Sequence, residues 1–169
     1  PMNSSAASDV YKRQSINSGV DFRSIRFPGV ISFDTIPSGG TTDYAPQMIH
    51  SALKNQHFDC KLSPQTNLPF ISINKAIYSI VKLMNVKKID STLRAFNVQE
   101  ISFTAKDLSD ILKEKFPIFT VSFNKDKKFQ SVADTWPSSL NCSMFRKYWD
   151  FSTEVHLKEF IEKIIEKIK

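Results

Sequence analysis

Short strand-like segments alternate with amphipathic helical segments along most of this 169-residue chain. The first segment, VDFRSIRF at 20–27, places apolar and polar side chains in turn, which is the period-two pattern of a strand. Further strands are predicted at 57–62, 68–73, 92–98 and 118–123. Helices are predicted between and after these strands, at 44–55, 74–84, 105–116 and 157–169. Such alternation is typical of the α/β class of folds.

Each predicted helix has one apolar face, which identifies the side chains that we expect in the core. In the helix at 44–55 these are Ala45, Met48, Ile49, Ala52 and Leu53. In the helix at 74–84 they are Ala76, Ile77, Ile80, Val81 and Met84. In the last helix they are Leu157, Phe160, Ile161, Ile164, Ile165 and Ile168. Thr104 and Asp107 have the spacing of a capping box at the start of the helix at 105–116.

The first fourteen residues differ from the rest of the chain. They are small and polar, and they follow neither the strand nor the helix period. The chain opens on Pro1, and SSAASDVYKRQ resembles translated adapter sequence, so we exclude residues 1–14 from the fold prediction as an artefactual or disordered leader. Residues 15–169 have a length that fits one domain with a sizeable core.

Composition and charge exclude several classes of protein. Hydrophobic residues make up 41% of the chain, which argues against disorder. No apolar run reaches the roughly 18 residues needed to cross a bilayer, and no secretory signal is visible, so neither a membrane partner nor secretion is expected. The net charge of +6 permits a nucleic-acid partner. However, the basic residues are mixed with acidic ones, which favours a solvated surface without nucleic acid.

Motifs that complete an active site are absent from the sequence. There is no GxGxxG fingerprint, no P-loop and no Gly-x-Ser-x-Gly, so no catalytic residue is assigned. The two cysteines and three histidines have no metal-ligand spacing, and no metal site is predicted. The cysteines also fall in no paired motif, which indicates a reducing compartment.

Two glycine-containing stretches are the candidate ligand contacts. In the first, Pro28 and Gly29 end the strand at 20–27, and they either form an ordinary turn or let a flat cofactor approach the backbone. In the second, SGGTTDYA at 38–45, the threonines precede a helix. Thr41 or Thr42 would cap that helix, or bind a substrate amine or carboxylate. Trp136 is either a pocket wall or simple core packing.

Five stretches then occur in an order that resembles one known family: FRSIRFPGVIS, GGTTDYA, LPFISINKAI, FNVQEISFTAKDL and ADTWPSSLNCSMFRKYWDF. Together they are similar to the second half of the L-threonine 3-dehydrogenases of the extended short-chain dehydrogenase family, related to the NAD-dependent epimerases and dehydratases. The likeness runs from about Val20 to the C-terminus. It implies that residues 15–169 form the C-terminal part of an NAD-binding Rossmann-type fold together with a small substrate-binding subdomain. The N-terminal Rossmann half would then be missing.

The resemblance also implies an activity and a set of contacts. The family oxidises L-threonine to 2-amino-3-oxobutyrate with NAD, using a Tyr-x-x-x-Lys pair that lies upstream of this segment. By resemblance, Pro28, Gly29 and Val30 would contact the nicotinamide end of NAD. Thr41, Thr42 and Trp136 would contact the threonine substrate. We therefore expect a fragment that is inactive alone, forms a homodimer when full length, and resides in the cytoplasm or the mitochondrial matrix.

Two alternatives remain open from the sequence. The first is a fragment of an NAD-dependent nucleotide-sugar epimerase or dehydratase, which would need Arg and Asn side chains around a diphosphate. The second is a small basic nucleic-acid-binding module, which would bind heparin or DNA with a steep dependence on salt.

Overall fold

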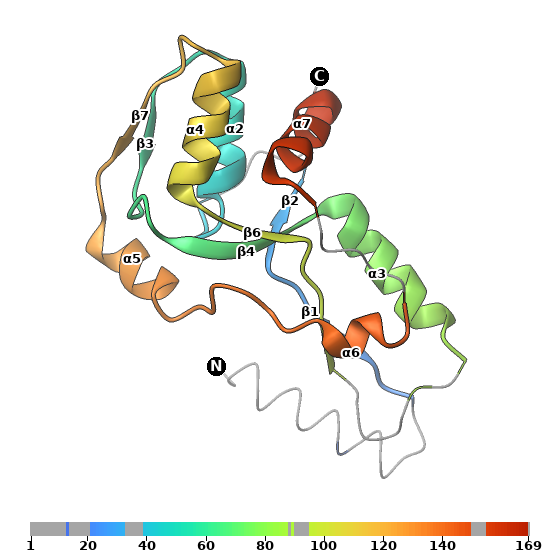
Figure 1. The fold of residues 1–169 in the computed structure, drawn as a ribbon. Helices are drawn as coiled ribbons and strands as arrows, with labels where there is room; N and C mark the ends of the chain where they lie inside the picture. Colours follow the sequence, from blue (N-terminus) through green and yellow to red (C-terminus); the bar gives the residue numbers. More distant parts are fainter. Residues whose placement is uncertain are drawn as a thin grey trace.

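The computed structural model describes residues 13, 21–32, 39–87, 89, 95–149 and 155–168 of the chain. Its strands are β1 (Ser24–Arg26), β2 (Gly29–Ile31), β3 (Phe58–Cys60), β4 (Asn67–Ser72), β5 (Ala95–Asn97), β6 (Ile101–Thr104) and β7 (Val121–Phe123). Its helices are α2 (Tyr44–Leu53), α3 (Ile73–Asn85), α4 (Ala105–Lys115), α5 (Lys127–Ala133), α6 (Ser143–Arg146) and α7 (Leu157–Ile168) (Figure 1). Apart from Arg13, the predicted leader lies outside the described residues, as does the start of the strand predicted at 92–98.

The described strands form three small sheets. The central sheet has the order β2-β4-β6, with β2 parallel and β6 antiparallel to β4. Two parallel pairs, β1-β5 and β3-β7, complete the set. The predicted α/β class is therefore confirmed. Two strands, β2 and β6, were not predicted. Strand β2 begins at Gly29, where the Pro28-Gly29 pair indicates the end of a strand.

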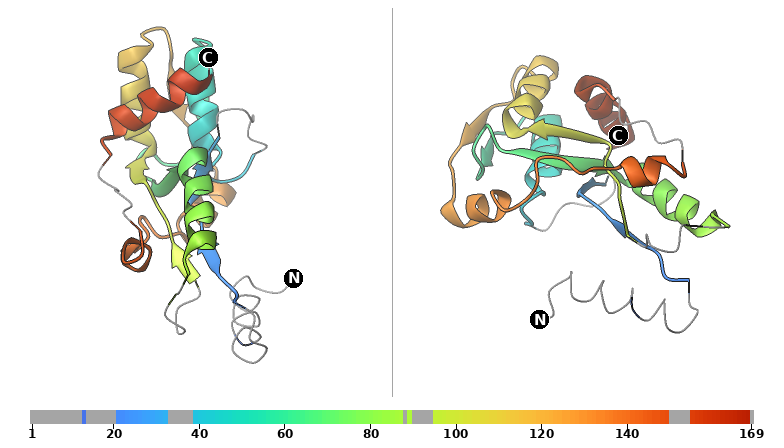
Figure 2. Two further views of the ribbon diagram at one scale, coloured as in Figure 1. Left: turned by 90° about the vertical axis from the view of Figure 1, so that its right-hand side faces the viewer. Right: turned by 60° about the horizontal axis from the view of Figure 1, so that its bottom comes forward.

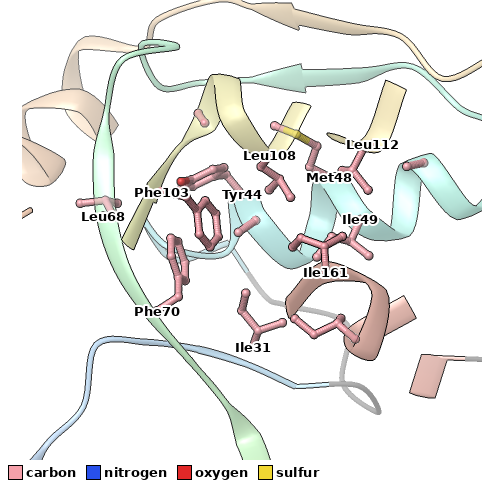
Figure 3. Close-up of a cluster of buried hydrophobic side chains, with 14 of the residues drawn as sticks. Ile31, Tyr44, Met48, Ile49, Leu68, Phe70, Phe103, Leu108, Leu112 and Ile161 are labelled. Carbon is pink, nitrogen blue, oxygen red and sulfur yellow. The ribbon is translucent and has the colours of Figure 1, made fainter. Parts of the chain in front are cut away.

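The larger hydrophobic core lies between the central sheet and helices α2, α4 and α7 (Figures 1 and 3). Its aromatic centre is Phe70 of β4, which stacks on Phe103 of β6 with ring centroids 4.4 Å apart. Tyr44 of α2 meets the Phe70 ring edge-on at 6.0 Å. The predicted core residues of α2 and α7 are confirmed in large part: Ala45, Met48, Ile49, Ala52, Phe160, Ile161, Ile164 and Ile165 are buried.

Helix starts show one correct and one wrong prediction. The capping box of α4 is confirmed, since Thr104 Oγ1 accepts from Asp107 N–H at 3.1 Å and Asp107 Oδ2 accepts from Thr104 N–H at 3.0 Å. The prediction that Thr41 or Thr42 caps α2 is wrong. Asp43 is the N-cap residue, and its side chain makes no hydrogen bond to the helix.

A second core surrounds the β1-β5 pair, where Phe96 of β5 packs edge-on against Phe145 and Trp149. Helix α3 covers this pair and lies apart from α2, α4 and α7 (Figure 2). The predicted burial of the α3 face is mostly wrong. Ala76 is buried, but four of the predicted residues are exposed: Ile77 (52%), Ile80 (43%), Val81 (49%) and Met84 (75%). The described neighbours of α3 cover the side that carries Ala76, Ser79 and Leu83 and leave these four residues exposed.

Candidate functional site

One cavity of about 410 Å³ gathers most of the residues that the sequence singles out. It lies beside the connection between β1 and β2 and the start of α2. Its lining consists of Phe27, Pro28, Gly29, Val30, Thr42, Asp43, Pro69, Trp136, Pro137 and Leu140. Five of the six predicted site residues are therefore brought together. The sixth, Thr41, lines a smaller cavity of about 120 Å³ behind the same loop.

Phe27 and Pro28 connect β1 to β2, which begins at Gly29, and their apolar side chains line the cavity. Gly29 pairs with Phe70 in the parallel β2-β4 ladder. A Cβ atom added to Gly29 would lie 2.8 Å from the Phe70 ring and 2.9 Å from Thr42 Cγ2, so the position has no room for a side chain. Glycine is therefore required here by internal packing. The cavity wall itself is formed by Phe27 and Val30, which are 36% and 39% exposed.

The loop before α2 is held by its own carboxylate. Asp43 Oδ2 accepts hydrogen bonds from the N–H groups of Gly39 at 3.0 Å and Gly40 at 2.6 Å. Gly39 has φ +114°, a conformation that side-chain-bearing residues rarely adopt. The turn closes with a bond from Asp43 N–H to Gly40 O at 3.0 Å. Because these two amides already have an anionic partner, the loop is not a phosphate cradle.

The opposite wall comes from the segment after α5. Trp136 is 42% exposed although it lines the cavity, which favours a pocket wall over core packing. Its backbone is fixed by a bond from Trp136 N–H to Ala133 O at 3.1 Å. Further along, Leu140 N–H donates to Gln99 Oε1 at 2.5 Å, which ties this wall to the end of β5.

Sequence reasoning missed several lining residues, including Phe27, Asp43, Pro69 and Leu140. For Pro69 a signal exists, because proline within a strand cannot donate to the ladder and marks an unusual position. Phe27 directly precedes the Pro28-Gly29 pair, a sequence that interrupts a strand, so exposure of Phe27 could have been expected. Leu140 belongs to a segment without periodicity, and only its contact with Gln99 places it.

The chemistry available in this cavity is limited. Among the described residues that line it, Asp43 is the only ionisable side chain, and none is a Tyr, Lys, His, Cys or Ser. The nearby Tyr44 lines the smaller cavity, and burial raises the pKa of its hydroxyl well above the ordinary value, so it stays protonated. Within the described ranges, no group of His, Cys, Asp and Glu could hold a metal ion. The cavity can position a ligand, and the one candidate base on its described lining is the Asp43 carboxylate, whose Oδ2 already accepts hydrogen bonds from Gly39 and Gly40.

The described helices include none long and apolar enough to cross a membrane. The fold matches part of a known architecture, that of the GalE-like extended short-chain dehydrogenases. The solved L-threonine dehydrogenase of Cupriavidus necator superposes with a TM-score of 0.86 at 31% identity, covering 96% of this chain and 59% of that one.

The sequence comparison defines the relationship further: the chain is homologous to L-threonine 3-dehydrogenases. It is 36% identical to the mitochondrial L-threonine 3-dehydrogenase of Bos taurus over 147 residues, which are 87% of this chain and 39% of that protein. An uncharacterised epimerase/dehydratase of Staphylococcus aureus is 32% identical over 152 residues, 47% of its length. No protein-family model matches. The chain thus spans about half the length, or less, of these curated relatives.

Proposed function

We propose that this chain is the C-terminal portion of an NAD-dependent enzyme that oxidises L-threonine to 2-amino-3-oxobutyrate. The observation that carries the proposal is the single cavity that unites Pro28, Gly29, Val30, Thr42 and Trp136. These residues come from the end of β1, from β2, from the loop before α2 and from the segment after α5. Homology to L-threonine 3-dehydrogenases supports the same reading.

The residues present fit one end of NAD. Phe27, Pro28 and Val30 form an apolar wall against which a flat nicotinamide ring can pack. When bound, NAD supplies the acceptor for the hydride that leaves the substrate. The amides of Gly39 and Gly40 are engaged by Asp43, so this loop does not bind the dinucleotide phosphates. We infer that the phosphates bind to a dinucleotide-binding half of the full-length protein that lies outside this chain.

Threonine fits the remaining side of the cavity. The Thr42 hydroxyl can bond a polar group of the substrate, and Trp136 closes the pocket around its small side chain. Asp43 supplies the only charge on the described lining, and that charge is opposite to the substrate ammonium. Thr41, which lines the other cavity, is assigned no direct contact under this proposal.

The chain alone is expected to be inactive. Oxidation of the hydroxyl needs a group that takes its proton, and the described cavity lining offers only the Asp43 carboxylate, which is engaged by the amides of Gly39 and Gly40. Purified chain mixed with L-threonine and NAD should give no NADH above the blank. The same chain extended by its upstream coding sequence should give threonine-dependent NADH. Threonine-dependent turnover by the chain alone, or none by the extended protein, would overturn the proposal.

A nucleotide-sugar epimerase or dehydratase is the second candidate, and the Staphylococcus aureus relative favours it. A sugar diphosphate would need cationic side chains, and the described lining has no Lys or Arg. Incubation of the extended protein with nucleotide sugars, with product analysis, separates the two candidates. A homodimer and a cytoplasmic or mitochondrial location are part of the main proposal.

A further inference from the structure

The buried face of the short helix α5 carries a glutamine. Gln130 is 4% exposed and shares this face with Ala133. Its side-chain amide has a partner at each end. Oε1 accepts from Ser63 N–H at 2.7 Å, while Nε2 donates to Thr66 Oγ1 at 3.0 Å and to Asp134 Oδ1 at 2.6 Å. A buried polar side chain bonded in this way holds the segments that it joins in one arrangement.

These bonds connect α5 to the strand that forms one side of the large cavity. Ser63 and Thr66 belong to the connection between β3 and β4, which lies next to α5 in Figure 1. Strand β4 begins directly after Thr66 and contributes Pro69 to the cavity lining. The position of α5 relative to this wall is therefore set through Gln130.

The other end of the network leads to Trp136 on the opposite wall. Asp134, which accepts from the Gln130 side chain, also donates its N–H to Gln130 O at 2.8 Å. Two residues later, Trp136 N–H donates to Ala133 O at 3.1 Å. The Trp136 side chain lines the cavity, whereas Gln130 lies outside its described lining. Gln130 therefore acts on the cavity through Trp136.

The position of α5 depends strongly on this one side chain. The helix has seven residues, which is too short for a helix to be stable by itself, so tertiary contacts must hold it. Its start is capped by Asp126, whose Oδ1 accepts from the N–H groups of Lys128 and Phe129. Towards its end, the buried side chains are those of Gln130 and Ala133, and the methyl group of Ala133 contributes little area.

We propose that Gln130 is a positioning residue that holds Trp136 against the cavity and thereby limits the size of the substrate side chain. This inference rests on the proposed function, in which Trp136 closes the pocket around the small side chain of threonine. It adds a determinant of specificity among 2-amino-3-hydroxy acids. Without the Gln130 amide, Trp136 moves more freely and the cavity accepts substrates with a longer carbon chain.

The position of Trp136 is measured in the chain itself, independently of activity. The chain has two tryptophans, so labelling with fluorotryptophan gives two fluorine NMR resonances, which Trp136→Phe assigns. Gln130→Ala should shift or broaden the Trp136 resonance and leave that of Trp149, in the other core, unchanged. Thr104→Ala is the matched control. It removes the capping box of α4 and lowers stability, but both resonances should stay in place.

An exchange of donor and acceptor tests the hydrogen bond directly. Gln130→Glu puts a carboxylate beside that of Asp134, so it should perturb the Trp136 resonance as Gln130→Ala does. Addition of Asp134→Asn returns an amide donor to this pair and should restore the parent resonance. A general loss of stability would not be reversed by the second substitution. Failure of Asp134→Asn to restore the resonance would overturn the inference.

Substrate selectivity is measured in the chain extended by its upstream coding sequence. The quantity is kcat/KM for L-threonine divided by kcat/KM for 2-amino-3-hydroxypentanoate, which is one methylene longer. Gln130→Ala should lower this ratio by about tenfold, the scale on which an apolar pocket discriminates one methylene. Thr104→Ala should leave it unchanged.

Three results would overturn the inference: an unchanged Trp136 resonance in Gln130→Ala, unchanged selectivity in that variant, or equal effects of Thr104→Ala. Failure of the proposed function gives a different result. In that case the extended parent protein shows no threonine turnover, while the fluorine resonances still report whether Gln130 holds Trp136.

Discussion

At the scale of single residues, packing explains features that looked like ligand contacts. Gly29 suggests that a cofactor approaches the backbone closely. However, glycine is needed at this position because a side chain would collide with Phe70 and Thr42. Similarly, Gly39 and Gly40 resemble an anion cradle, but Asp43 occupies their amides. The side chains that remain available to a ligand are those of the neighbours, such as Val30 and Trp136.

Substitution Gly29→Ala should destabilise the chain by about 1–3 kcal/mol, the usual cost of overpacking a filled site. The new Cβ would lie 2.8 Å from the Phe70 ring, which is itself fully buried and cannot move aside. The midpoint of urea unfolding measures the change. Gly40→Ala is the control and should cost clearly less, because its nearest atom is the exposed Asp43 Oδ2 at 3.3 Å. Equal losses would show that Gly29 is not confined by Phe70.

Two variants of Asp43 separate its charge from its hydrogen bonds, assayed in the extended, active protein. Asp43→Asn keeps an oxygen that accepts from Gly39 and Gly40 but removes the charge, whereas Asp43→Ala removes both. If the carboxylate attracts the substrate ammonium, both variants should raise KM for L-threonine, by about tenfold or more. If Asp43 only holds the loop, Asp43→Asn should behave like the parent enzyme and only Asp43→Ala should be impaired.

At the scale of elements, the sequence predicts best where the controlling contacts are local. Helix α4 and its capping box were predicted because Thr104 and Asp107 are three residues apart. The α2 cap was wrong because Asp43, one residue after the threonines, is the N-cap residue, and its side chain accepts from the amides of Gly39 and Gly40. The α3 burial was wrong because periodicity identifies an apolar face without showing what covers it.

The candidate site follows the same rule. The Pro28-Gly29 pair and the paired threonines were singled out by their residue types, but neither pattern specifies a ligand by itself, and only the family resemblance assigned NAD and threonine to them. Contacts between distant segments were not predictable, because they depend on register: the pairing of Gly29 with Phe70 sets Pro69 into the wall. The bond between Gln99 and Leu140 likewise joins residues 41 positions apart in the sequence.

At the scale of the whole molecule, the described structure contains two hydrophobic cores of unequal size. The larger one joins the central sheet to α2, α4 and α7. The smaller one joins β1, β5 and α6 to the buried face of α3, whose other face is exposed. Because buried apolar area is the main stabilising term, the larger core should have the higher local stability.

Hydrogen exchange of the chain alone should show this difference. Amides in the middle of α3 should exchange at least about tenfold faster than those in the middle of α2 and α4. The expectation follows from the exposed face of α3 and the fully buried Ala45, Met48, Ile49 and Leu108 on the other two helices. Peptide-resolved mass spectrometry measures the rates under conditions where the chain stays folded. Uniform protection across all three helices would contradict a two-core description.

Strand β4 forms the border between these cores, and successive residues of β4 belong to different cores. Phe70 belongs to the larger core, whereas Ile71 belongs to the smaller. Successive side chains of a strand point to opposite faces, so the gain or loss of a single codon within β4 would exchange the two sets. Insertions and deletions during evolution should therefore be confined to the connections around β4. A gap placed inside β4 in an alignment with relatives would indicate an error in the alignment.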